Sequence, residues 1–418
     1  MSGGEGERGL SGTEATFAYT HALTGGSGRL TTSFTVRGTF SPERVERAVR
    51  GWLARLPLLS LRITGADGGL CFRQGVPTGA HSLLTAPAGA DDEVAGERLW
   101  RLRAGPGPAG TTRFRLTLHP AICDGYSVGR LVRPLLDALF DTPGPDTADR
   151  AAQALPPDTD DLTYEGGDGC VCGACGPGAA RAGRTESPHR DGSRPGDDRT
   201  PGVLAPGVVA LTLTPYESRR LREWCRAGRV TVSGFLTTVL ADALARETGR
   251  PEVTVATAMS LRRRYAERTL IAEPGCVLGL VKARLNAGAA GDTLGGRARA
   301  NAAVLCSAGR AWRPERRPHT GIRHAVEREA RARGPEVRVV DAGSVDTALG
   351  PHAARVTGLC TVAARGTGGG PGGSLYLSTF KGALTVALSS RGLGERGTAR
   401  AERELSEAAL LRPTFAPL

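Results

Sequence analysis

The sequence predicts an α/β protein built as two lobes. In each half of the 418-residue chain, short apolar segments typical of strands alternate with longer segments whose apolar residues recur at helical spacing. A stretch dominated by Gly, Pro, Asp and Arg separates the two halves. A single core would be unusually large for this length. We therefore predict a first lobe over 1–145, a linker without stable structure over 146–206, and a second lobe over 207–418.

The first lobe begins with a strand and an amphipathic helix. Apolar and polar residues alternate from Leu30 to Val36, which is typical of a half-buried strand. Ser41 is a suitable N-cap for the helix that follows, and Pro42 suits its first position. Apolar residues then recur at helical spacing and form one stripe. We expect this helix to end at Pro57, because proline cannot continue it.

A polar turn separates the next strand from the next helix. Residues 113–118 alternate as a strand, and residues 127–140 carry an apolar stripe at helical spacing. Pro134 lies within that helix and should bend it. The turn between them contains His119, Asp124 and Gly125, so polar side chains are predicted at the end of a buried strand.

The second lobe repeats the alternation of strands and helices. Thr214 and Glu217 form a capping box around Pro215, which predicts the start of a helix. A further helix over 233–248 should end at Gly249. The remaining predicted elements are strands over 208–213, 252–259, 356–364, 374–379 and 384–389, and a last helix over 398–411.

The positive charge of the chain does not indicate a nucleic-acid-binding protein. The net charge of +12 comes almost entirely from arginine, and these residues are scattered rather than aligned on one helix. Aromatic residues make up only 5% of the chain, so platforms for stacking bases are scarce. A positive rim would instead attract an acidic carrier protein or an anionic acyl thioester.

No segment of the sequence predicts attachment to a membrane or export. No apolar run is long enough to cross a bilayer, and the first residues lack the pattern of a signal peptide. We therefore expect a cytoplasmic protein. Most of its nine cysteines are expected to be reduced.

The most specific pattern lies in the polar turn. His119-Pro120-x-x-x-Asp124-Gly125 resembles the H-H-x-x-x-D-G signature of condensation-type acyltransferases, with Pro120 at the second histidine. Residues 211–249, 258–264 and 273–279 also resemble stretches of this superfamily, which includes nonribosomal peptide condensation domains and polyketide-associated acyltransferases. The resemblance implies two chloramphenicol acetyltransferase-like lobes that form a V around a central tunnel.

The resemblance also implies roles for the residues of the turn. The second histidine of the signature is the catalytic one, and Pro120 has no group that can accept or donate a proton. The signature Asp is structural, so we expect Asp124 to pair with Arg262 of the second lobe. Gly125 is expected to permit the tight turn into the helix. His119 is either a replacement catalytic residue or a structural histidine that bonds to nearby backbone.

Two kinds of function remain open. The first is a stand-alone condensation-like acyltransferase of nonribosomal peptide or polyketide metabolism, which forms an amide or ester from an acyl thioester. The alternative is a catalytically degenerate module that binds carrier proteins or recruits a tailoring enzyme, or a cyclase that uses the same tunnel. The expected partner is an acyl or peptidyl carrier protein or a CoA thioester. No cofactor is expected beyond the phosphopantetheine or CoA that carries the substrate.

Cysteine offers two further candidates for chemistry. Cys170, Cys172 and Cys175 form a cluster with His189 as the nearest possible fourth zinc ligand. Their spacing matches no known zinc finger, so incidental linker cysteines are the favoured interpretation and no metal is predicted. Cys123 precedes Asp124, whose charge would raise the pKa of the thiol. We predict a buried, unreactive thiol there.

The arginine run 262–264 has a functional and a structural interpretation. It could hold the phosphate of phosphopantetheine, because guanidinium groups bind phosphate well. The favoured prediction is one buried structural arginine, Arg262, followed by two solvated ones.

Overall fold

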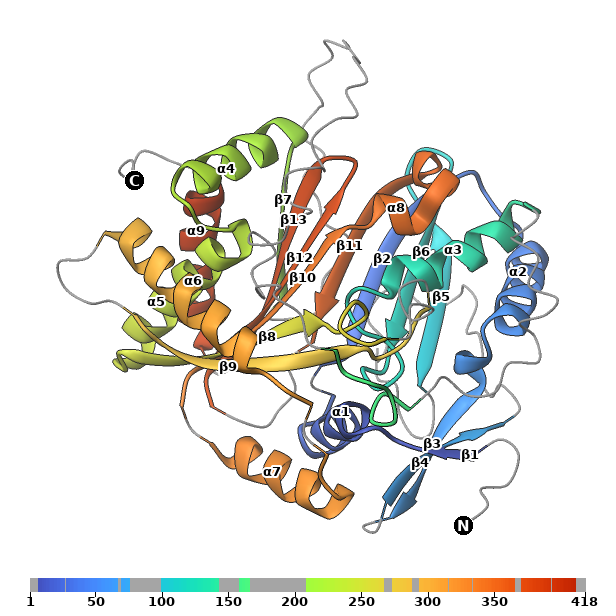
Figure 1. Ribbon diagram of the computed structural model, residues 1–418. Coiled ribbons are helices and arrows are strands. Elements are labelled where there is room, and N and C mark those ends of the chain that lie inside the picture. Colours follow the sequence, from blue (N-terminus) through green and yellow to red (C-terminus); the bar gives the residue numbers. More distant parts are fainter. Residues whose placement is uncertain are drawn as a thin grey trace.

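The protein contains two large β-sheets that lie next to each other, with helices on their outer sides (Figure 1). The computed structural model describes residues 7–26, 28–66, 69–75, 99–142, 158–165, 208–266, 273–287, 293–314, 316–332, 334–364, 370–391 and 393–410. Within these ranges no helix combines the length and the apolar character needed to cross a membrane.

The first sheet has four antiparallel strands. Their order is β11 (Val356–Ala363), β2 (Leu30–Arg37), β6 (Thr111–Leu118) and β5 (Trp100–Pro106). Helices α2 (Pro42–Arg55) and α3 (Val128–Leu139) lie together on its outer side (Figure 1). The indole of Trp52 on α2 is fully buried and donates to the Leu131 carbonyl of α3 at 2.8 Å, which fixes the two helices against each other.

The second sheet has six strands and a parallel centre. The order is β7 (Val208–Leu213), β13 (Ala383–Arg391), β12 (Gly372–Phe380), β10 (Glu336–Ser344), β8 (Glu252–Ser260) and β9 (Leu278–Asn286). Strands β12, β10 and β8 run parallel to one another. The outer side carries helices α4 (Pro215–Ala227), α5 (Val232–Thr248), α6 (Leu294–Ala311) and α9 (Gly394–Ala409) (Figure 1).

A small third sheet and two helices complete the lower part of the molecule in Figure 1. The sheet contains β1 (Glu7–Gly9), β4 (Gly69–Gln74) and β3 (Leu61–Ala66), and the helices are α1 (Gly12–Leu23) and α7 (His319–Arg331). His319 joins these parts, because its Nδ1 accepts from the Leu70 amide at 2.7 Å and its Nε2 bonds to the Leu10 carbonyl at 2.9 Å. Short helical turns, η1 (Pro57–Ser60), α8 (Asp346–Leu349) and η3 (Gly350–Ala354), connect other elements.

The predicted α/β class and most of the predicted elements are confirmed. The capping box at Thr214 and Glu217 is present with both of its hydrogen bonds, and α5 ends at Gly249 in a left-handed conformation. The last helix begins one turn earlier than predicted. Helices α1, α6 and α7 and strands β9 and β10 are among the elements that were not predicted.

The two halves of the sequence do not map separately onto the two large sheets. Strand β11 belongs to the second half of the sequence but pairs with β2 of the first half, from Val356 beside Val36 to Ala363 beside Leu30. In addition, Asp137 of α3 bonds to His352 of η3 at 2.6 Å. A division of the chain at residue 206 therefore does not separate the two sheets, because β11 of the second half is a strand of the first sheet.

One short part of the predicted linker is packed against the protein. The Gly12 amide at the start of α1 donates to Asp160 Oδ2 at 2.6 Å, and Tyr164 forms a β-bridge with Tyr265. Residues 158–165 thus have a defined structure, contrary to the expectation of a linker without any. The rest of that segment lies outside the described residues.

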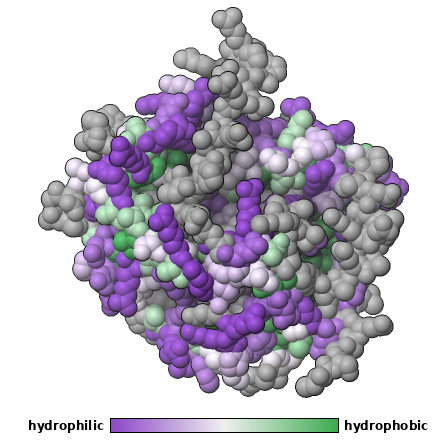
Figure 2. All heavy atoms as spheres, in the orientation of Figure 1, coloured by the Kyte–Doolittle hydropathy of each residue, from purple (hydrophilic) through white to green (hydrophobic). Residues whose placement is uncertain are grey.

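The surface is mostly hydrophilic on the face that Figure 2 shows. Hydrophobic residues occur there in small separate groups between charged and polar ones. Across the described residues, the exposed large hydrophobic side chains are Leu23, Tyr216 and Val304.

Candidate active site

The polar turn lies where the first half of the chain meets the second. Strand β6 ends at Leu118, His119 and Pro120 begin a turn, and α3 starts at Val128. The Ile122 amide donates back to the His119 carbonyl at 3.2 Å, which closes the turn. The intervening residues contact the segment that follows β8 and the segment that precedes β9.

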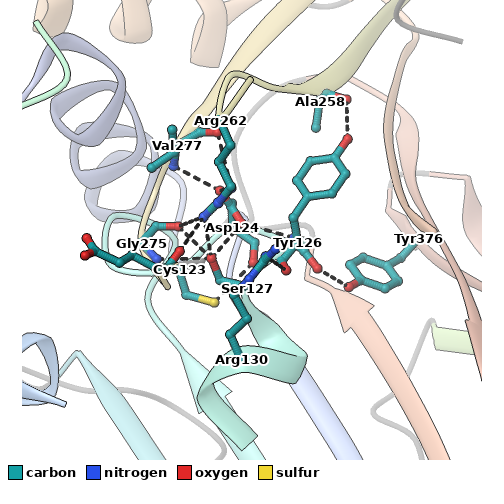
Figure 3. A network of polar contacts seen from close by, with 12 residues as sticks. Cys123, Asp124, Tyr126, Ser127, Arg130, Ala258, Arg262, Gly275, Val277 and Tyr376 are labelled. Carbon is teal, nitrogen blue, oxygen red and sulfur yellow. Dashed lines mark hydrogen bonds and ion pairs between the residues drawn. The ribbon is translucent and has the colours of Figure 1, made fainter. Parts of the chain in front are cut away.

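Asp124 has every carboxylate lone pair directed to a donor (Figure 3). Its Oδ1 accepts from the Tyr126 amide at 3.1 Å and from Ser127 Oγ at 2.9 Å. Its Oδ2 accepts from Arg262 Nη1 at 2.6 Å and from the Val277 amide at 2.9 Å. The side chains of Asp124 and Arg262 are 0% and 4% exposed, so this is a buried ion pair. The predicted pairing is present, and a carboxylate so fully bonded is suited to hold structure rather than to transfer protons.

Ser127 connects the ion pair to the second half of the chain. Its Oγ accepts from Arg262 Nη2 at 2.7 Å and from the Gly275 amide at 3.0 Å. Arg262 Nη2 also donates to the Gly275 carbonyl at 3.1 Å. The sequence did not predict this role for Ser127, which is the N-cap residue of α3 but makes no side-chain capping bond to it. Together, Asp124, Arg262, Ser127 and Gly275 form a closed set of bonds that we call the brace.

Gly125 is required for a different reason from the one predicted. Its φ lies outside the left-handed region, so the turn itself does not need glycine. A Cβ at this position would lie 2.5 Å from Cγ1 of Val340 on β10, which is a severe overlap. The Gly125 carbonyl accepts from the Tyr376 hydroxyl at 2.9 Å, and the neighbouring Tyr126 hydroxyl donates to the Ala258 carbonyl at 3.1 Å (Figure 3). Close approach of the second sheet therefore explains the glycine.

His119 is buried and neutral. Only 6% of its surface is exposed, its amide donates to the Leu99 carbonyl at 2.7 Å, and its Nδ1 accepts from the Ala121 amide at 3.1 Å. Burial, and secondarily the neighbouring His21, lower the pKa of His119 to about 3. Because Nδ1 accepts a hydrogen bond, the single proton of the neutral ring is assigned to Nε2. His119 in this form is a hydrogen-bond donor and not a base at Nε2.

Pro120 occupies the position that the resemblance gives to the catalytic histidine. The residue is buried. A Cβ placed on Gly28 would lie 3.4 Å from the Pro120 ring and 3.6 Å from the ring of Phe17 on α1. Pro120 thus lies close to Gly28, which follows α1, and it brings no proton-transfer group there.

Comparisons with known proteins identify the fold. No family model matches the sequence, and no curated protein matches it. Solved structures match over nearly the whole chain. Polyketide synthase associated protein 5 from Mycobacterium tuberculosis is 18% identical, with 98% of this chain and 99% of that one covered and a TM-score of 0.61.

Two further structures give the same result. TRI3 trichothecene 15-O-acetyltransferase from Fusarium sporotrichioides is 13% identical, with 97% and 95% covered and a TM-score of 0.65. The starter condensation domain of rhizomide synthetase RzmA is 15% identical, with 97% and 94% covered and a TM-score of 0.61. This chain has the fold of condensation domains and related acyltransferases.

Within this condensation-domain fold, Cys123 is unreactive as predicted. It is buried, and burial first and the charge of Asp124 second raise the pKa of its thiol well above the usual value. Its Sγ donates to the Asp124 carbonyl at 3.2 Å. The thiol is therefore part of the packing behind the turn.

The prediction for the arginine run was wrong for one residue. Arg262 is buried and Arg263 exposed as expected, but Arg264 is also buried. Its Nη1 donates to the Tyr164 hydroxyl at 3.2 Å, within the short packed part of the predicted linker. The sequence could not show this contact, because the segment that covers Arg264 carries no apolar periodicity.

The remaining cysteines give no further site in the condensation-domain fold. Cys170, Cys172 and Cys175 lie outside the described residues, and no cluster of three or more possible metal ligands occurs within the described ones. Within the part of the chain that the structure describes, five cysteines are free thiols: Cys71, Cys123, Cys225, Cys276 and Cys360. Cys306 is disulfide-bonded, which is an exception to the expected reduced state.

Proposed function

We propose that this chain is a stand-alone condensation-like acyltransferase that forms an amide or ester from an acyl thioester on a carrier protein or CoA. The brace carries this proposal, since it fixes the turn that bears His119 to the second half of the chain. The named relatives support the reaction class by analogy of fold, because TRI3 is an acetyltransferase and the RzmA domain was solved with C8-CoA.

The reaction that fits the site does not use a side chain of the motif as a general base. The acceptor hydroxyl or amine attacks the thioester carbonyl, a C–O or C–N bond forms, and the C–S bond breaks. The acceptor proton ends on the released thiol, so the reaction needs no net proton acceptor. Pro120 cannot take that proton, and His119 holds its own at Nε2. The acceleration would then come mainly from holding the two reactants in place.

One observation, the proline at position 120, favours a second candidate function. A module that lost the catalytic histidine but kept the brace could bind carrier-linked intermediates or recruit a tailoring enzyme without transferring an acyl group. The brace would be needed in either case, because it holds the fold together.

An acyl-transfer assay separates the two candidates. Thiol release would be measured with acetyl-CoA, octanoyl-CoA and an octanoyl-loaded carrier protein, each with a panel of amines and alcohols, while calorimetry measures binding. We expect the natural protein to transfer the acyl group, and His119→Ala to reduce the rate about 100-fold or more. The control is a change of the exposed His324 to Ala, which should have no effect.

Other results would contradict the proposal. Thioester binding without thiol release, together with a gain of activity in Pro120→His, would establish the degenerate module. Failure to bind any of the three thioesters would exclude both candidates.

A further inference from the structure

Two imidazole rings from distant parts of the chain lie side by side, and one of them belongs to His119, the residue before Pro120. His21 is in the last turn of α1, and His119 follows β6. Their ring centroids are 4.2 Å apart and the ring planes are tilted by 54°. Helix α1 thus places a second histidine, His21, beside His119. The residue that follows His119 in the motif is a proline.

The proton positions of both rings follow from their surroundings. The Ala121 amide donates to His119 Nδ1 at 3.1 Å, so His119 carries its proton on Nε2. Nδ1 of His21 is buried and has no hydrogen-bond partner among the described residues. A buried N–H without an acceptor is rarely tolerated, so the proton of neutral His21 is also assigned to Nε2. Both rings are therefore N–H donors at Nε2.

One cationic side chain, Arg29, lies near His21. A Cβ on Gly26 would lie 3.6 Å from Arg29 Nη1 and 3.8 Å from His21 Cε1, so the guanidinium and the imidazole border the same glycine. Burial first and the charge of Arg29 second lower the pKa of His21 to about 4. Both histidines are thus uncharged at neutral pH, and the nearby charge of Arg29 would favour a negative ligand at His21.

We propose that His21 and His119, assisted by the charge of Arg29, bind a negatively charged oxygen. Two ligands share this chemistry. One is the carbonyl oxygen of the acyl thioester while it carries charge during transfer, and that assignment rests on the proposed function. The other is the carboxylate of a free acid.

The reaction step balances without a base. As the acceptor adds to the carbonyl carbon, the π electron pair moves to the oxygen, where the imidazole N–H groups stabilise it. When the intermediate collapses, the pair returns, the C–S bond breaks, and the acceptor proton passes to the thiolate. The histidines keep their own protons throughout.

A binding experiment tests the site without requiring catalysis. Imidazole NMR signals of the intact protein would be followed during titration with acetate and octanoate, with octanamide as the neutral probe. We expect a carboxylate to shift both ring signals and raise both pKa values, and octanamide to have a much smaller effect. His21→Ala should weaken carboxylate binding about tenfold or more, and His324→Ala should not. Absence of any response of the two rings to either carboxylate would overturn the inference.

The transfer assay distinguishes the oxyanion from the free carboxylate. His21→Ala should lower kcat about 100- to 1,000-fold, the typical effect of removing one oxyanion donor. His21→Gln keeps an N–H donor near the position of Nε2, so it should recover most of this loss. If His21 acted as a base, Gln would be as inactive as Ala, and the donor role would be excluded. Equal activity of all three proteins would exclude any role for His21 in transfer.

The two proposals fail in different ways. Carboxylate binding by both rings, without thiol release from any thioester, would exclude the acyltransferase and leave the anion site in place. Thiol release that is insensitive to His21→Ala, with no response of the rings to carboxylates, would exclude the anion site and leave the acyltransferase.

Discussion

The two ends of the polar turn, with Asp124 at one and His119 at the other, differ in how completely their polar groups are hydrogen-bonded. At one end, four donors surround the Asp124 carboxylate, and Arg262 neutralises its charge. At the other end, His21 and His119 are uncharged, and one buried ring nitrogen of His21 has no partner among the described residues. Only the four residues 120–123 separate His119 of the imidazole pair from Asp124 of the brace. The first end therefore holds the two halves of the chain together, and the second is the end at which we propose that an anion binds.

The physical reason for the difference is the cost of burial. A buried charge is tolerated only when it is paired and fully hydrogen-bonded, which describes the brace. An unsatisfied buried group lowers stability, and such groups persist mainly at functional sites. Substitutions of Arg262, Gly125, His21 and His119, together with stability measurements at several pH values, test whether this division of roles is correct.

The largest expected effect comes from breaking the brace. Arg262→Met leaves the Asp124 carboxylate buried and unpaired, so we expect a loss of about 3–5 kcal/mol in the free energy of unfolding. Denaturant titration measures this loss. The matched control is Lys282→Met, which removes an exposed ion pair with Glu329 and should cost about 1 kcal/mol or less. If Arg262→Met were no more harmful than Lys282→Met, the brace would not be what joins the halves.

Gly125→Ala should have an intermediate effect. The added methyl group would overlap Cγ1 of Val340, and overpacking of a core usually costs about 1–3 kcal/mol. The double change with Val340→Ala should recover part of this loss, since it removes the overlapping atom. Gly358→Ala serves as control, because a Cβ there meets nothing within 4 Å. A loss that Val340→Ala does not reduce would mean that the backbone, and not the contact, requires glycine.

The sequence predicted those parts of the molecule that depend on local signals. The capping box at Thr214, the end of α5 at Gly249 and strand β7 depend on local signals, and all three are confirmed. The Asp124–Arg262 pair followed from a motif resemblance. The pairing of β11 with β2 was not predictable, because strand partners distant in sequence leave no local pattern.

His21 and Gly125 show the same limit within the site. His21 is an ordinary polar residue near the end of a helix, and only the packing of α1 against the turn brings it to His119. The importance of Gly125 was predicted but its reason was not, because Val340 comes from a strand of the second sheet. The sequence shows which residues are candidates for a site. Contacts between residues of different sheets can be found only from the folded structure.

The last prediction concerns how the imidazole pair makes the free energy of unfolding depend on pH. An unfolded histidine has a pKa near 6.5, and the folded values of about 4 for His21 and about 3 for His119 lie below it. The unfolded chain therefore binds more protons than the folded one once the pH falls below about 6.5. The free energy of unfolding should then decrease by up to about 1.4 kcal/mol per pH unit for each ring. The contribution of His21 should end near pH 4, and that of His119 should continue below it.

Substitution of each ring isolates its share of this slope. Denaturant titrations between pH 7.5 and 4.5 would compare the natural protein with His21→Gln, His119→Gln and His324→Ala. Each Gln variant lacks one titrating ring, so its stability should fall less steeply below about pH 6.5, whereas His324→Ala should keep the natural slope. Saturating octanoate should flatten the slope of the natural protein as well, because a bound carboxylate favours the protonated rings. Identical slopes in all four proteins would show that the two histidines titrate in the folded state as they do in the unfolded chain, and the contrast between the two ends of the turn would then be one of geometry alone.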